Sequence, residues 1–259
     1  MSSLLKKIKA TIKLLLDCLG LQIRKVQPES KLNISSEISH SNYSPLSTYS
    51  PWKNNKKFRR VYRFAKKYSL VDEFRMFELY QLASQAAKIN GDFLEIGVWK
   101  GGTSAIIGSA LIENEGAEKN FYIADTFEGV VKTGSKDDLY MGNEHSNASV
   151  EDVKDLFDKI KLPKPEILVG IFPDDHNHLE INSLAFVHCD VDVYDSTKDI
   201  IDWCIPRMES GGIIVFDDYG FYTTTGVTRY VNELFKKEDI SKDFIMVHNL
   251  NGHAILIKK

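Results

Sequence analysis

The chain has 259 residues, of which 43% are hydrophobic and 27% are charged, and its formal net charge is −3. These values are typical of one large soluble domain with appendages, and the slightly acidic charge argues against nucleic acid as a partner. Cys18, Cys189 and Cys204 lie far apart and form no C-x-x-C pair, so they predict neither a disulfide framework nor a zinc cluster. A reducing, cytoplasmic setting fits best.

Residues 1–25 predict a basic amphipathic helix. Apolar residues recur at helical spacing with lysines between them: Leu4, Leu5, Ile8, Ile12, Leu15, Leu16 and Leu19 alternate with Lys6, Lys9 and Lys13. The run is too short and too charged to span a membrane, and it lacks a signal-peptide cleavage site. Two interpretations stay open. The helix either makes a peripheral contact with anionic lipid at the inner face of the membrane or with a partner, or it packs on its own domain.

Residues 26–57 are rich in Ser, Asn and Pro and poor in aliphatic residues, which predicts a linker. The main domain is expected over residues 58–259. Helical periodicity in Phe58–Tyr68 and Val71–Asn90 predicts two helices that lead into it, the second ending at Asn90-Gly91.

After Gly91, short apolar runs alternate with helical stretches. Strands are expected at Phe93–Gly97, Phe121–Asp125, Glu166–Val169, Leu184–Asp190 and Gly212–Asp217, with helices near Thr103–Leu111, Val150–Ile160, Thr197–Arg207 and Gly226–Phe235. This alternation predicts an α/β fold with a doubly wound, mostly parallel sheet. Two last runs, Phe244–His248 and Ala254–Ile257, flank an Asn251-Gly252 turn and predict a C-terminal antiparallel hairpin.

The first expected strand ends in the glycine-rich turn LEIGVWKGGTS, residues 94–104. Gly97 and Gly101 let the backbone turn tightly and approach a ligand, and the helix starting near Thr103 presents free N–H groups. A nucleotide-like or carboxylate-bearing ligand is expected here. Trp99 stands where the dinucleotide motif needs its second glycine, which argues against NAD and FAD.

Two acidic residues end the first two strands. Glu95 is expected on the ligand side of the first, and Asp125 is placed to accept hydrogen bonds from ribose hydroxyls. Phe127 has two interpretations, because it could cover an adenine ring or pack in the core.

Carboxylates gather at the ends of the fourth and fifth strands. The segment AFVHCDVDVYDST (residues 185–197) contains Asp190, Asp192 and Asp195, and GGIIVFDDY (residues 211–219) contains Asp217 and Asp218. Neighbouring parallel strands would bring Asp190 close to the Asp217-Asp218 pair. Because ionised carboxylates repel one another, the cluster predicts a hard divalent cation such as Mg²⁺, Mn²⁺ or Ca²⁺.

The other two aspartates of the first segment have different interpretations. Asp195, or Ser196 beside it, is expected to cap the helix beginning near Thr197. The role of Asp192 stays open between structural support and proton acceptor.

Five segments, in this order between Gly91 and about Phe235, resemble the macrocin O-methyltransferase family: GDFLEIGVWKGGTS, IADTFEG, ASVEDVKDLF, DVDVYDST and GGIIVFDDYGFYTTTGVTRYV. That family comprises class I S-adenosylmethionine-dependent enzymes with a Rossmann-like sheet that methylate sugar hydroxyls. The resemblance implies cofactor contacts from Glu95, Gly97, Thr103, Ser104 and Asp125 and a magnesium site at Asp190, Asp217 and Asp218. Where the family reads DGDLYEST this chain reads DVDVYDST, so the acceptor stays open.

The implied reaction is magnesium-assisted methylation of a sugar hydroxyl on a glycan or glycosylated small molecule. Asp190 or Asp192, on a rigid strand end, is the expected proton acceptor, with His145 a weaker candidate from a polar loop. Two alternatives remain: a methyltransferase of a catechol or other diol, and a non-catalytic, cofactor-binding partner subunit. The sequence also leaves a homo-oligomer open.

Overall fold

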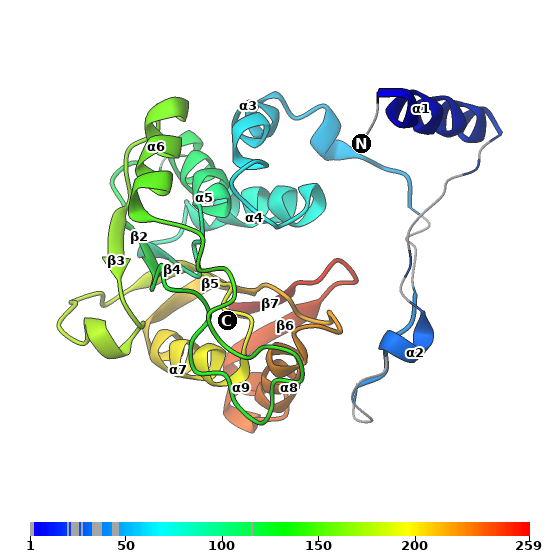
Figure 1. The fold of residues 1–259 in the computed structure, drawn as a ribbon. Coiled ribbons are helices and arrows are strands. Elements are labelled where there is room, and N and C mark those ends of the chain that lie inside the picture. The colour runs from blue at the N-terminus through cyan, green and yellow to red at the C-terminus, as the bar shows by residue number, and fades with distance from the viewer. Residues whose placement is uncertain are drawn as a thin grey trace. The chain divides into compact units, whose positions relative to one another are not determined.

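The computed structural model describes residues 3–19, 21, 26, 28–32, 38–42, 47–114 and 116–259. The chain divides into two compact units, Met1–Leu46 and Ser47–Lys259. Figure 1 shows both units and the course of the chain within each.

The first unit contains helix α1 (Ser3–Cys18) and one turn of helix, α2 (Glu29–Leu32), which lies within the predicted linker. Residues 1–2, 20, 22–25, 27, 33–37 and 43–46 of the predicted helix and linker lie outside the described residues. The apolar side chains Ile8, Ile12 and Leu15 of α1 and Leu19 directly after it are 46–71% exposed. Across the described part of the chain, no helix combines the length and the hydropathy needed to cross a membrane.

The second unit is an α/β domain in which a seven-stranded sheet is covered by helices on both faces. Its strands are β1 (Asp92–Ile96), β2 (Phe121–Asp125), β3 (Glu166–Val169), β4 (Leu184–Cys189), β5 (Met208–Phe216), β6 (Phe244–His248) and β7 (Ala254–Lys258). Its helices are α3 (Lys56–Ala65), α4 (Glu73–Ala86), α5 (Gly102–Glu113), α6 (Val150–Ile160), α7 (Tyr194–Cys204), α8 (Thr225–Leu234) and α9 (Glu238–Asp243), with 3₁₀ turns at Pro51–Lys53, Asp174–His176 and Ile205–Arg207.

The strand order is β3-β2-β1-β4-β5-β7-β6. Strands β1 to β5 are parallel, and β7 pairs antiparallel with both β5 and β6. The predicted doubly wound, mostly parallel sheet with a C-terminal antiparallel hairpin is therefore confirmed.

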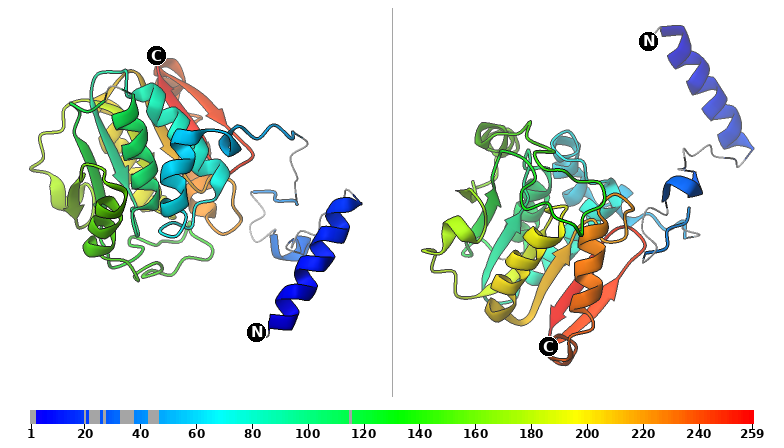
Figure 2. Two further views of the ribbon diagram at one scale, coloured as in Figure 1. Left: turned by 90° about the horizontal axis from the view of Figure 1, so that it is seen from above. Right: turned by 60° about the horizontal axis from the view of Figure 1, so that its bottom comes forward.

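Two cores form because successive strand residues point to opposite faces. Phe93 packs in a core with α3, α4, α5 and α6, whereas the next residue, Leu94, packs in a second core with α7 and α8. Figure 2 shows the sheet between these two helical layers. Strands buried on both faces appear in the sequence as continuous apolar runs, which is why the runs predicted the strands well.

The start of α7 corrects one expectation. The helix begins at Tyr194 rather than near Thr197, and neither Asp195 nor Ser196 caps it. Instead, the Tyr194 backbone N–H donates to Oδ1 of Asp137 over 2.9 Å, and the Ser196 hydroxyl donates to the Val131 carbonyl over 3.0 Å. A loop distant in sequence therefore supplies the cap, which the local pattern of residues could not predict.

Candidate active site

The candidate site lies where β1 and β4 are neighbours and the connections leave in opposite directions, the usual ligand position of doubly wound sheets. Gly97, with φ +86°, and Asp190 follow these two strands directly. The Asp190 N–H donates to the Ile96 carbonyl over 2.8 Å, and a Cβ on Gly97 would lie 1.6 Å from the Asp190 carbonyl oxygen. Only glycine fits here, so the two strand ends can approach each other.

Asp125, at the end of β2, organises the glycine-rich turn. Its Oδ2 accepts from the backbone N–H groups of Val98 and Trp99 over 2.7 and 2.8 Å, and its Oδ1 accepts from the Phe127 N–H over 2.7 Å. Both Trp99 (φ 48°) and Phe127 (φ 55°) have left-handed backbone conformations, which cost energy in residues other than glycine. The carboxylate thus holds two strained turns at the edge of one cavity.

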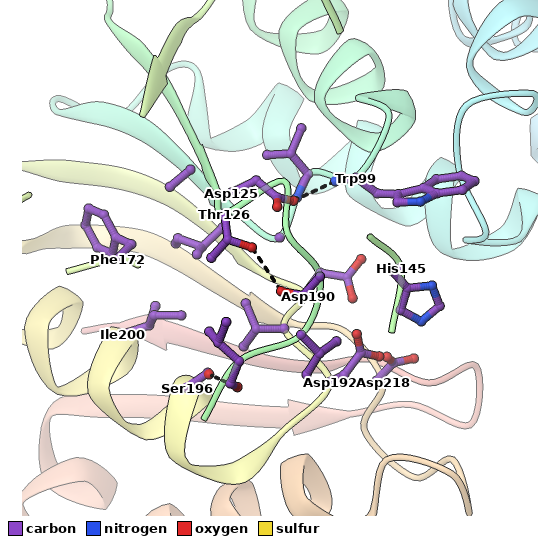
Figure 3. Close-up of a pocket in the computed structure, with 18 of the residues that line it drawn as sticks. Trp99, Asp125, Thr126, His145, Phe172, Asp190, Asp192, Ser196, Ile200 and Asp218 are labelled. Atoms are coloured by element: carbon purple, nitrogen blue, oxygen red, sulfur yellow. Dashed lines mark hydrogen bonds between the residues drawn. The ribbon is translucent and has the colours of Figure 1, made fainter. Parts of the chain in front are cut away.

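This cavity has a volume of about 240 Å³ and two chemically different ends. Phe172 and Ile200 line the apolar end, and Ala124 and Ile171 are further apolar residues of the lining. Arg75, Tyr140, Asp190, Asp192 and Asp218 line the polar end. Figure 3 shows Phe172 and Ile200 at one end, and Asp192 and Asp218 side by side at the other with Asp190 and His145 close by.

Asp190, Asp192 and Asp218 form the acidic end, which we call the open carboxylate cluster. One oxygen from each lies within 4.8 Å of the others. Asp192 (φ 65°) and Asp218 (φ 63°) both adopt left-handed backbone conformations, which are uncommon in residues other than glycine. Burial and the repulsion among the aspartates raise the pKa of Asp190 and of Asp218 well above their usual range. Such a cluster is suited to a hard cation.

Asp217 lies behind this cluster rather than in it. Its side chain is fully buried and forms an ion pair with Arg75, and its Oδ1 accepts from the Asp218 N–H over 2.7 Å. Burial alone would raise the pKa of Asp217, but the positive charges of His253, His188 and Arg75 outweigh it and hold that pKa well below the usual range. The structure therefore groups Asp192, not Asp217, with Asp190 and Asp218.

A long loop, residues 126–149, covers the acidic end. Lys132 bonds to Asp174 and Asp199 over 2.7 Å each, which fixes one part of the loop to α7 and to the turn after β3. Further along, Asp138 accepts from the Thr225 hydroxyl of α8 over 2.7 Å. Figure 1 shows the loop (green) crossing α7 and α8.

The loop brings Tyr140 into the site. Its hydroxyl donates to Oδ1 of Asp192 over 2.8 Å and lies 3.4 Å from Nε2 of His145. Burial together with the negative charge of Asp192 raises the pKa of Tyr140, so the phenol stays protonated as a donor.

The structure divides the sequence-predicted cofactor residues into two groups. Gly97, Thr103 and Asp125 line the cavity. Glu95, Gly101, Ser104 and Phe127 lie behind its wall: Glu95 accepts from the Ser104 hydroxyl and contacts His188, Gly101 precedes α5 in a left-handed conformation, and Phe127 packs against the core. The second group can support the turn but does not face the cavity in this conformation.

Sequence reasoning missed Arg75 and Tyr140, which line the acidic end of the cavity, and the buried His188 and His253. Arg75 precedes the motifs in sequence, and Tyr140 lies in a polar loop without periodicity. His188 could have been found from the sequence, because it lies two residues before Asp190 and residues two apart in a strand share a face.

The fold is one found in O-methyltransferases. The structure of the O-methyltransferase NovP is similar, with a TM-score of 0.63 and 23% sequence identity over 74% of this chain and 82% of NovP. More narrowly, the chain belongs to the macrocin O-methyltransferase family, whose model matches residues 5–253. The recognised family resemblance is thus confirmed.

Two curated relatives agree with this assignment. The chain is 30% identical over 140 residues to 8-demethyl-8-(2,3-dimethoxy-alpha-L-rhamnosyl)-tetracenomycin-C 4'-O-methyltransferase of Streptomyces olivaceus, covering 51% of this chain and 54% of that protein. It is 30% identical over 142 residues to demethyldecarbamoylnovobiocin O-methyltransferase of Streptomyces niveus, covering 51% and 53%. The matched region thus spans about half the length of each relative.

Proposed function

We propose that this protein transfers the methyl group of S-adenosylmethionine to a sugar hydroxyl of a glycan or glycosylated small molecule. One observation carries the proposal: a single cavity joins the Asp125-organised glycine turn to the open carboxylate cluster. Membership of the macrocin O-methyltransferase family and the rhamnosyl compound in a relative's name support a sugar acceptor.

The cofactor would lie along the cavity. Phe172 and Ile200 offer an apolar surface for adenine, and Gly97 gives the backbone clearance that a close-lying ribose or amino-acid chain needs. Oδ2 of Asp125 accepts hydrogen bonds from two backbone N–H groups, which hold the carboxylate in place. A ribose hydroxyl of the cofactor would donate to this same carboxylate. The sulfonium methyl group would then point toward the acidic end.

Three carboxylates around one point suit Mg²⁺, which prefers oxygen ligands and keeps coordinated water. Asp190 and Asp218 would hold the ion, with Asp192 beside them and Asp217 fixing the Asp218 backbone from behind. When bound, the cation would supply a Lewis acid that lowers the pKa of an acceptor hydroxyl.

Asp192 is our proposed proton acceptor. Tyr140 orients its Oδ1, and the rigid end of β4 places both Asp192 and Asp190 beside the acceptor space. Holding the hydroxyl oxygen in line with the methyl carbon and the sulfur supplies much of the rate enhancement, because it removes the entropic cost of alignment.

The test is methyl transfer by the full chain to a panel of glycosides, catechols and simple diols. We expect methylation on a sugar hydroxyl, abolished by chelation and restored by Mg²⁺. Methylation of catechols alone would contradict a sugar acceptor and indicate a catechol methyltransferase. Cofactor binding measured by calorimetry, without turnover on any acceptor that a family member uses, would instead indicate a non-catalytic partner subunit.

We also propose that α1 binds the surface of an anionic membrane. Residues 1–25 contain six Lys or Arg and one Asp, in a chain whose net charge is −3. Ile8, Ile12 and Leu15 are exposed along the helix, and Leu19 is exposed directly after it. An apolar stripe with basic flanks suits the interface of anionic lipid. Full-length protein should sediment with anionic but not zwitterionic vesicles, and Ile12→Asp/Leu15→Asp should remain in the supernatant. Equal partitioning of both proteins would contradict the proposal.

A further inference from the structure

Helix α3 and the turn after it carry a strongly basic surface. Residues 47–71 contain eight Lys or Arg and no Asp or Glu, although the net charge of the whole chain is −3. A concentration of charge opposite in sign to that of the chain is typical of a surface that binds a charged partner, here an anionic one. Figure 1 shows α3 at the top of the domain, on the far side from α9.

The basic residues lie opposite the part of α3 that packs on the domain. Phe58, Val61 and Ala65 are buried, and they recur at helical spacing along one side of the helix. The same spacing places a second row along the other side, where every side chain is exposed. We call this row the basic face of α3, and its members are Lys56, Arg60, Arg63 and, in the turn that follows the helix, Lys67.

The charge on the basic face of α3 is available to a partner. Arg60 forms an ion pair with Glu113 over 2.5 Å, but its side chain remains 65% exposed. Among the residues that the structure describes, no carboxylate forms an ion pair with Lys56, Arg63 or Lys67. An anionic surface that approached α3 would therefore meet exposed cations that acids of this domain do not already hold.

An exposed apolar residue adjoins the basic face where the cavity opens. Leu70 follows Lys67 closely in sequence, is 66% exposed and lines the cavity, so it lies at the opening. Tyr68, between them, accepts a hydrogen bond from Nζ of Lys159 on α6 over 2.8 Å, which adds a further cation. Cations around an exposed apolar side chain are typical of surfaces that bind anionic lipid.

We propose that the basic face of α3 binds the surface of an anionic membrane, with Leu70 in contact with the lipid head groups. Each Lys or Arg near such a surface strengthens binding roughly fivefold. A membrane fits these observations better than an acidic protein, because the chain carries a second basic segment with exposed apolar residues, α1. The α3 contact is additional to that of α1, and two weak contacts give stable binding where one is marginal.

This contact would fix how the domain faces the membrane. Leu70 lies at the opening of the cavity, so docking through the basic face would turn that opening toward the lipid head groups. A sugar carried on a lipid would then reach the open carboxylate cluster from the membrane surface. The inference that the acceptor is a lipid-linked sugar rests on the proposed methyl transfer, whereas the binding of lipid does not.

The first test is sedimentation of the full-length protein with vesicles of phosphatidylglycerol and phosphatidylcholine in equal parts. Arg63→Glu/Lys67→Glu should lower the partition coefficient by about 25-fold, because two cations of the basic face are lost. The control is Lys236→Glu/Lys242→Glu, which changes exposed lysines beside and within α9. It should lower partitioning far less, because it alters only the net charge.

Two results of this experiment would overturn the proposal. Equal partitioning of the wild type and Arg63→Glu/Lys67→Glu would indicate that the basic face serves another partner, such as an acidic protein. An equal loss of binding in Arg63→Glu/Lys67→Glu and in the control would show attraction by net charge alone. Ile12→Asp/Leu15→Asp tests α1 separately, so the two contacts can fail independently.

A second measurement locates the contact on the bound protein. Vesicles that contain brominated phosphatidylglycerol should quench the indole added by Leu70→Trp but not the one added by Ile245→Trp, at an exposed position of β6. Each variant is compared with the wild type, so that the three native tryptophans are subtracted. Equal quenching of the two added indoles would contradict an orientation set by α3.

A third test separates docking from catalysis. Arg63→Glu/Lys67→Glu should methylate a lipid-linked glycoside in anionic vesicles about tenfold more slowly than the wild type, and a soluble glycoside at the same rate. An equal effect on both acceptors would overturn the inference of a lipid-linked sugar. Protein that sediments as predicted but methylates neither acceptor would refute the proposed methyl transfer and not the lipid contact.

Discussion

The hydroxyl of Tyr140 donates a hydrogen bond to Oδ1 of Asp192 over 2.8 Å, joining the loop above the cavity to the end of β4. The phenol thereby orients a carboxylate that the open cluster needs, and it comes from a segment that Lys132 and Asp138 fix to neighbouring elements. The loop is thus part of the site rather than only its cover.

Tyr140→Phe should lower kcat by about 10- to 150-fold while leaving the affinity for S-adenosylmethionine unchanged. The substitution removes one hydrogen bond to a charged group, worth about 1.5–3 kcal/mol, and keeps the ring. Steady-state kinetics with calorimetry of cofactor binding would check this. Phe127→Leu, which alters a ring packed against the core, serves as the comparison, and a loss of kcat there equal to that of Tyr140→Phe would argue against a specific role for the phenol.

Substitutions of Asp192 and Asp217 should have different effects, the first on activity and the second on stability. Asp192→Asn should reduce kcat by about 100-fold or more, because it removes the proposed proton acceptor, with little change in the free energy of unfolding. Asp217→Asn should cost about 3–5 kcal/mol of stability, because Arg75 loses a fully buried partner. Activity assays and urea unfolding check the pair. A fully active Asp192→Asn would show that Asp192 is not the proton acceptor.

Removing a carboxylate from the open cluster should stabilise the metal-free protein at high pH. The pKa of Asp218 is raised, so its contribution to stability is fully present below the ordinary carboxyl pKa and is lost as the pH rises through the raised value. In a chelating buffer, Asp218→Asn should therefore unfold at higher urea than the wild type at about pH 8, with the difference shrinking toward about pH 5.

The control for this experiment is Asp158→Asn, which changes an exposed acid paired with Lys164. It should show almost no such pH dependence, because surface ion pairs contribute little. A stability gain for Asp218→Asn that is the same at both pH values would show that repulsion in the cluster is not its cause.

Gly97→Ala should prevent or severely impair folding, because the new Cβ would lie 1.6 Å from the Asp190 carbonyl oxygen. The matched variant is Gly220→Ala. Gly220 also has a positive φ, of +91°, but a Cβ added there would meet no atom within 4 Å, so only backbone strain of about 1–2 kcal/mol is expected. Thermal unfolding compares the two, and equal losses would mean that the close approach of β1 and β4 is not the constraint.

Local patterns predicted the sheet well, because each of the five parallel strands contains a short apolar run closed by a glycine or an aspartate. They also predicted that Asp190 and Asp218 would meet, since parallel strands end at one edge. They could not predict that Asp217 turns toward Arg75, because that depends on a helix far away in sequence. The same holds for Tyr140 and for Asp137 at the start of α7, which irregular loop backbone brings into place.

The central claim is that the Asp125 turn and the open carboxylate cluster act together in methyl transfer to a sugar. The most direct measurement is mass spectrometry and NMR of a glycoside incubated with S-adenosylmethionine, Mg²⁺ and either wild-type protein or Asp190→Asn. We predict a single O-methyl group on the sugar ring with the wild type and no methylation with the variant. Equal methylation by both proteins would contradict the account.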